Sequence, residues 1–179
     1  MTKSDFEIKS LVYFVLIAFT FNLVFSICGF CCVESSLKQI LLYQIGNAFA
    51  ISGAVMAGRY IGLRNEQVAA SGFILLGIAH GISLGALSRS AINIDREMTI
   101  VMPMIPALAC MFWCGIFPKW LRLCGLIPIS LFTMVYVRVQ LGYDYFGWPQ
   151  TLGYGTLQII EILWGIYIYK DWKEQKVVK

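Results

Sequence analysis

The sequence predicts an all-α, polytopic membrane protein whose six transmembrane helices form one compact bundle. Hydrophobic residues make up 59% of the 179 residues and charged residues only 13%, about half the charge of a typical soluble domain. Charged residues also divide the chain into six apolar segments, each near the roughly 20 residues that a helix needs to cross a bilayer. These segments are continuously apolar and do not alternate, which argues against a β-barrel.

The predicted spans cover the chain as a single integral membrane domain, residues 1–179. Each of the first four contains an uncharged run of 20 to 24 residues, whereas Arg138 and Glu161 interrupt the last two. The first run is longer than the 7–15 apolar residues of a signal peptide, so we interpret it as a mature helix. In order, the spans are 10–33, 39–62, 67–88, 98–118, 121–143 and 149–169.

The basic residues predict that both termini are cytoplasmic. Ten lysines and arginines fall on the side of the termini, whereas only Lys38, Arg89 and Arg96 fall on the other side. Such residues concentrate in cytoplasmic loops. We therefore expect a multi-pass protein of the lipid bilayer, in the plasma (inner) membrane if the source is bacterial. The formal net charge of +4 is too small to indicate a nucleic-acid partner.

Small residues recur every fourth position in the second and third spans. The stripes are Ala50, Ala54, Gly58 and Gly62 in the second span, and Gly77, Gly81 and Gly85 in the third. Small residues let helix backbones approach closely in lipid, so we expect the two spans to form a tight hairpin. The alternative is that the Gly58/Gly62 face or the Gly77/Gly81/Gly85 face binds a second copy or a partner subunit.

Polar residues fall inside the spans at overlapping depths, which predicts a shared polar site within the bundle. Glu161 lies near the middle of the bilayer, about 18 Å below the surface at 1.5 Å per residue. Its carboxyl group is expected either to stay protonated or to pair with Arg138 or protonated His80. The predicted site comprises Asn22, Asn47, His80, Arg138, Gln158 and Glu161.

Ionisable groups inside a membrane favour a functional role, which leads to our first hypothesis. It is a small transporter, channel or substrate-binding subunit that handles a small solute or ion, with proton coupling through Glu161. The second hypothesis is a non-catalytic membrane partner or structural subunit, in which the polar groups only set helix register. No G-x-x-x-x-G-K phosphate loop is present, so uphill movement would depend on an ion gradient or a partner subunit.

Cys28 and Cys31 suggest a third hypothesis, a membrane thiol–disulfide oxidoreductase, because they have the C-x-x-C spacing of a redox pair. The pair is expected near the outer end of the first span, but no second pair follows on that side. Cysteine in a membrane helix often serves as a small apolar residue, so an enzyme is the less favoured reading. One histidine and dispersed thiols do not make a four-ligand metal site, and no metal or other cofactor is expected.

Overall fold

The computed structural model describes residues 3–33, 36–87, 94–143 and 147–177. Within these ranges the regular secondary structure is entirely helical, with no strand, which confirms the all-α prediction. The helices are α1 (Lys3–Phe30), α2 (Leu37–Leu63), α3 (Gln67–Leu87), α4 (Ile94–Met111), α5 (Lys119–Cys124), α6 (Leu126–Gln140) and α7 (Trp148–Val177).

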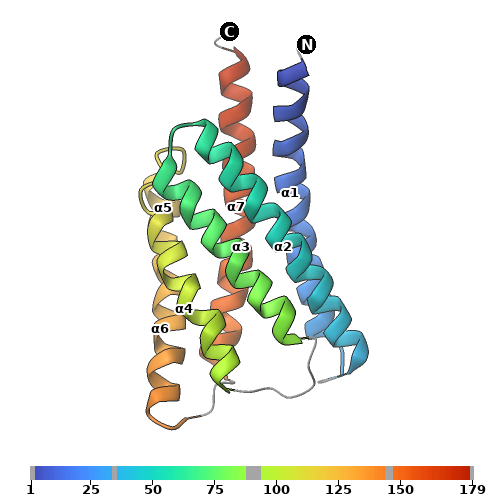
Figure 1. Cartoon of the computed structure of the whole chain (residues 1–179), viewed down its shortest axis with the longest axis vertical. Coiled ribbons are helices and arrows are strands. Elements are labelled where there is room, and N and C mark those ends of the chain that lie inside the picture. The colour runs from blue at the N-terminus through green and yellow to red at the C-terminus, as the bar shows by residue number, and fades with distance from the viewer. Residues whose placement is uncertain (1–2, 34–35, 88–93, 144–146, 178–179) are drawn as a thin grey trace.

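The six longer helices pack side by side in a closed ring. Around the ring, α1 contacts α2, α2 contacts α3, α3 contacts α4, α4 contacts α6, α6 contacts α7, and α7 returns to α1. Both termini lie at the same end of the bundle, where α1 and α7 extend beyond the other helices (Figure 1). We call this the terminal end, and the other end, where α1 finishes and α7 begins, the opposite end.

Four described segments are long and apolar enough to cross a membrane: Phe6–Phe30, Leu37–Leu63, Gln67–Gly85 and Lys119–Gln140. A shorter apolar helical segment, Val101–Met111, belongs to α4. These lengths and compositions are those of a multi-pass membrane protein. They also explain why large apolar side chains such as Ile17, Val24 and Ile78 lie exposed on the outside of the bundle.

Local sequence accounts for where α2 begins and ends. The Ser36 hydroxyl accepts a hydrogen bond from the Gln39 backbone N–H at 3.2 Å, which caps the first turn. After α2 ends at Leu63, Asn65 adopts a positive φ of 64°, a conformation that asparagine tolerates better than most residues. The chain thereby reverses into α3.

A proline divides the predicted fifth span, 121–143, into α5 and α6. Pro128 has no backbone N–H, and its ring clashes with the carbonyl of the residue four positions earlier, Cys124. Helix α5 ends at Cys124, and α6 starts at Leu126 after the single residue Gly125. The predicted fourth span, 98–118, is likewise shorter as a helix, since α4 ends at Met111.

The α2–α3 hairpin is tightly packed along only part of the predicted glycine stripes. A Cβ atom built at Gly58 would lie 3.1 Å from the Ala70 carbonyl oxygen, and one at Gly77 would lie 3.5 Å from Val55. No described atom lies within 4 Å of a Cβ built at Gly81. Close packing along the glycine stripe of α3 therefore ends near Gly77.

Candidate functional site

Four of the predicted polar residues meet in one hydrogen-bonded cluster, which we call the His–Glu cluster. It consists of Asn22 from α1, Asn47 from α2, His80 from α3 and Glu161 from α7. Glu161 has no exposed surface, and Asn22 and His80 are 2% and 3% exposed. The cluster therefore connects four separate helices through three buried polar residues and the half-buried Asn47.

Both carboxyl oxygens of Glu161 have partners. Asn22 Nδ2 donates a hydrogen bond to Glu161 Oε2 at 2.7 Å, and His80 Nε2 lies 3.0 Å from Glu161 Oε1. Burying a carboxyl group without hydrogen bonds costs several kcal/mol, so these two contacts are what make its position tolerable. The two hydrogen-bonding partners come from α1 and α3, on either side of α2 along the chain.

Asn47 determines which nitrogen of His80 carries a hydrogen. Its amide Nδ2 donates to the Tyr43 backbone oxygen at 3.0 Å, so its Oδ1 is the atom facing His80. An amide oxygen only accepts, so the His80 Nδ1 atom, 3.0 Å away, must be the donor. The orientation of one amide thus sets the histidine tautomer.

These hydrogen-bond directions leave the position of one hydrogen undetermined. Glu161 Oε2 accepts from Asn22 and His80 Nδ1 donates to Asn47, so only the contact between Oε1 and Nε2 can vary. That bond contains one hydrogen. It belongs either to Glu161, as a carboxylic acid facing neutral imidazole, or to His80, as an imidazolium facing a carboxylate. The pair is neutral overall in both forms, and loss of the hydrogen would leave one buried negative charge.

Gln158 and Ser26 form a second polar contact about one helical turn toward the opposite end. Gln158 Nε2 donates to the Ser26 hydroxyl at 2.6 Å, joining α7 to α1. Gly46 of α2 faces this region, because a Cβ built there would lie 3.3 Å from Asn22 Oδ1 and 3.4 Å from Ser26 Oγ. A glycine at this position therefore lets α2 approach the polar face of α1.

Arg138 does not join the cluster. It lies half-buried in the last turn of α6, with its guanidinium carbon 5.8 Å from the centre of the Tyr143 ring. This geometry is that of a cation–π contact near the end of the bundle. The predicted pairing of Arg138 with Glu161 is therefore absent. His80 and Asn22 are the hydrogen-bonding partners of the Glu161 carboxyl group instead.

The cysteines of the redox hypothesis lie at the opposite end of α1. Cys28 and Cys31 are exposed free thiols, and the neighbouring Cys32 thiol contacts the Cys28 backbone oxygen at 3.3 Å. Cys114 is buried near the start of α5, far along the chain from this pair. Within the described residues, no three histidine, cysteine, aspartate or glutamate side chains group together as metal ligands.

Sequence reasoning missed a polar contact at the terminal end. Asp171 of α7 accepts hydrogen bonds from the Tyr60 hydroxyl at 2.6 Å and from Arg64 Nε at 2.9 Å. Tyr60 and Arg64 are four residues apart, so they share one face of α2. That spacing was visible in the sequence, but nothing there indicated that α2 and α7 would meet.

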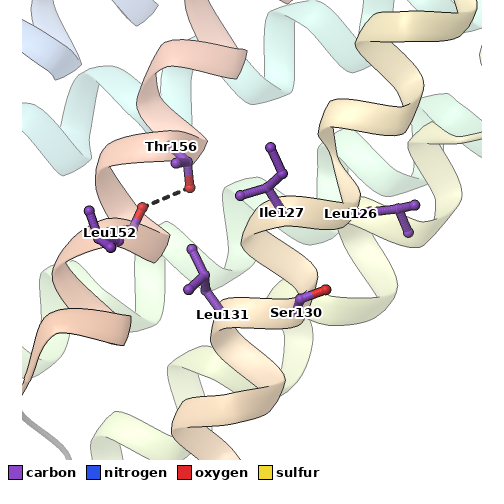
Figure 2. A pocket seen from close by; sticks show the side chains of 6 residues that line it. All are labelled: Leu126, Ile127, Ser130, Leu131, Leu152 and Thr156. Carbon is purple, nitrogen blue, oxygen red and sulfur yellow. Dashed lines mark hydrogen bonds between the residues drawn. The ribbon is translucent and has the colours of Figure 1, made fainter.

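Two hollows on the described surface lie away from the His–Glu cluster. An apolar groove of about 470 Å³ lies between α6 and α7, lined by Ile127, Leu131 and Thr156 among others (Figure 2). A smaller, more polar hollow of about 220 Å³ lies at the terminal end, between the connection from α4 to α5 and the last turns of α7. Neither is lined by Glu161 or His80.

The geometry of the His–Glu cluster defines the candidate site. Comparisons of the chain with protein-family models, with curated proteins and with solved structures found no match.

Proposed function

We propose that the protein is a small membrane transport protein in which the His80–Glu161 pair binds and releases a proton. In this proposal α1, α2, α3, α4, the α5–α6 pair and α7 each cross the bilayer, and both termini are cytoplasmic. The observation that carries it is the fully buried carboxyl–imidazole pair, whose bonding partners leave one exchangeable hydrogen. An ionisable pair of this kind within a membrane bundle is typical of proton-handling sites.

The energetics of buried ion pairs support a functional reading. Two charges removed from water stabilise a fold less than well-packed apolar residues of similar size do. The core of the bundle is otherwise formed mainly by apolar packing, for example where Phe19, Phe73 and Trp164 are buried. A protonatable pair is therefore an expensive way to connect helices, and proton exchange gives a physical reason for its presence.

The second candidate function is that of a non-catalytic membrane partner or structural subunit. The complete hydrogen bonding within the His–Glu cluster favours it. Asn22, Asn47, His80 and Glu161 satisfy one another without any bound solute. Such a network could serve only to set the relative positions of α1, α2, α3 and α7. The two candidates differ in whether the shared hydrogen leaves the site, and that can be measured.

The test compares Glu161→Gln with wild type in proteoliposomes. Glutamine can accept from Asn22 and donate to His80 Nε2, so the variant retains the hydrogen bonds but loses the exchangeable proton. We expect proton flux driven by an imposed membrane potential to fall by at least about a hundredfold, within the range for loss of a proton-transfer group. Glu174→Gln, in an exposed residue near the end of the same helix, is the matched control and should retain the flux.

The structural candidate predicts a different result. Wild-type protein and Glu161→Gln would then show equal flux, at the level of empty vesicles. Equal flux with correctly folded protein in both samples would reject the proton-handling role.

A further inference from the structure

The two sides of the His–Glu cluster differ in their polar side chains, although fully buried apolar residues such as Phe132 and Leu157 lie toward the opposite end as well. Toward the terminal end, the interior residues are apolar and fully buried, among them Phe73, Leu76, Trp164 and Ile168. Toward the opposite end, the neighbouring positions carry polar side chains that are only half-buried. They are Ser26, Gln44, Ser83 and Gln158.

Three aromatic rings form a layer directly on the terminal side of the cluster. The ring centre of Trp164 lies 5.2 Å from that of Phe73 and 6.0 Å from that of Phe117, and all three residues are at most 2% exposed. Trp164 follows Glu161 by three residues, which places it about 4.5 Å further along the helix axis. The layer therefore separates Glu161 from the terminal end.

The hollow at the terminal end reaches this layer from the other side. Its lining includes Phe117, Tyr167, Lys170 and Asp171, and its volume is about 220 Å³. Phe117 therefore borders the hollow while its ring stacks on Trp164. The rings of Phe117 and Trp164 lie between the hollow and the turn of α7 that carries Glu161.

A polar contact ties α2 to α7 beside the hollow. Asp171 accepts from Arg64 and from the Tyr60 hydroxyl, although α1 separates α2 from α7 in the ring of helices. The side chains of Arg64 and Asp171 are 33% and 17% exposed, so solvent reaches this ion pair. Partly exposed ion pairs contribute little stability and can break readily.

We infer that the aromatic layer of Phe73, Phe117 and Trp164, together with the Tyr60–Asp171–Arg64 contact, is a closed gate at the terminal end. The structure is then the state in which the His–Glu cluster exchanges its proton with the opposite end, along Ser26 and Gln158. Opening requires α7 to separate from α2 and the rings to move apart, which would connect the hollow to Glu161. This inference rests on the proposed proton-handling function.

The test measures passive proton leak through proteoliposomes after a pH step, using variants of the gate. Asp171→Asn weakens the contact between α2 and α7, and we expect the leak to rise about fivefold over wild type, as for a modest shift toward an open state. Phe117→Ala removes a ring from the layer and should raise the leak at least as much. Glu7→Gln alters an exposed acidic residue of α1 that lines neither hollow, and should leave the leak unchanged.

A second substitution shows whether the leak passes through the cluster. In the double variant Asp171→Asn with Glu161→Gln, the leak should fall to the level of Glu161→Gln alone, because the exchangeable proton is gone. A leak that persists in the double variant would mean that the bundle is merely damaged, and would overturn the gate.

The gate and the proposed function fail in distinguishable ways. Potential-driven flux that depends on Glu161, without any added leak in Asp171→Asn or Phe117→Ala, would reject the gate and leave the proposed function standing. Absence of Glu161-dependent flux in wild type would reject the proposed function itself.

Discussion

Glu161 illustrates how much a single buried side chain depends on its neighbours. Its two oxygens are bonded by Asn22 and His80, and it has no exposed surface in the folded bundle. Removing one partner of such a set leaves the remaining polar groups buried and unpaired, which costs more than the bonds themselves contributed. The effect of a substitution here therefore depends on whether the new side chain can still form hydrogen bonds.

Truncation and isosteric replacement of Glu161 should consequently differ. We expect Glu161→Ala to lower the free energy of unfolding by about 3 kcal/mol, because Asn22 and His80 lose their shared partner. Glu161→Gln should lower it by no more than about 1 kcal/mol, because both hydrogen bonds can be retained. Thermal unfolding in detergent micelles measures both, and equal losses in the two variants would contradict the assigned bonding.

The tautomer of His80 is a second prediction at the residue scale. Since Asn47 Oδ1 accepts from His80 Nδ1, that nitrogen should carry a hydrogen whichever way the proton shared with Glu161 lies. Nitrogen-15 NMR of protein labelled at histidine reports this directly, because His80 is the only histidine in the chain. Asn47→Leu removes the acceptor and should let the tautomer populations mix, whereas a wild-type spectrum with unprotonated Nδ1 would contradict the assignment.

At the scale of elements, glycine matters where two helices touch and not where a stripe merely continues. A Cβ atom built at Gly72 would lie 2.7 Å from the Ala107 carbonyl oxygen and 2.8 Å from the Cys110 Cβ, closer than real Cβ atoms approach their neighbours. Gly72 was not part of the predicted stripes, yet α3 meets α4 there. Gly81 was part of a stripe, yet a Cβ atom added to it would have no described atom within 4 Å.

Alanine substitutions at these two glycines of α3 should therefore behave oppositely. Gly72→Ala must push α4 away from α3, and we expect a loss of about 1–3 kcal/mol in unfolding free energy, as for other overpacked sites. Gly81→Ala, on the same helix, should change stability by no more than about 0.5 kcal/mol. Chemical unfolding in micelles compares the pair, and a Gly81→Ala loss as large as that of Gly72→Ala would show that Gly81 is covered by a partner.

At the scale of the whole molecule, the closed ring has both termini at one end (Figure 1), while Cys28 and Cys31 lie in the last turn of α1 and just after it, at the other end. This arrangement, combined with the excess of lysine and arginine on the side of the termini, predicts the topology in a membrane. The terminal end should face the cytoplasm. The exposed thiols should then face the outside.

Topology can be tested in intact cells. Tags at the N- and C-termini should both be protected from external protease, while a membrane-impermeant maleimide should label wild type from outside. Labelling should be lost when Cys28, Cys31 and Cys32 are replaced by serine, since Cys114 is buried and the half-buried Cys110 and Cys124 lie toward the terminal end. Accessible tags with protected thiols would reverse the orientation and with it the direction of the proposed gate.

The sequence by itself determined the helical class, the membrane character and most element positions, because apolar length and charge spacing act locally along the chain. It also identified Asn22, Asn47, His80 and Glu161 as polar groups at similar depths, since depth follows from counting residues along each helix. Pro128 carried the signal for a break in the fifth span, although the predicted boundaries ignored it.

The tertiary structure alone decided which of these groups meet. Depth does not specify the rotation of a helix or its neighbours, so Arg138 was grouped with Glu161 although it lies against Tyr143. The closing of the ring, which brings α7 beside α1 and within reach of α2, created both the His–Glu cluster and the Asp171 contact. These contacts join residues far apart in the chain, such as Tyr60 and Asp171, and depend on packing that no local pattern encodes.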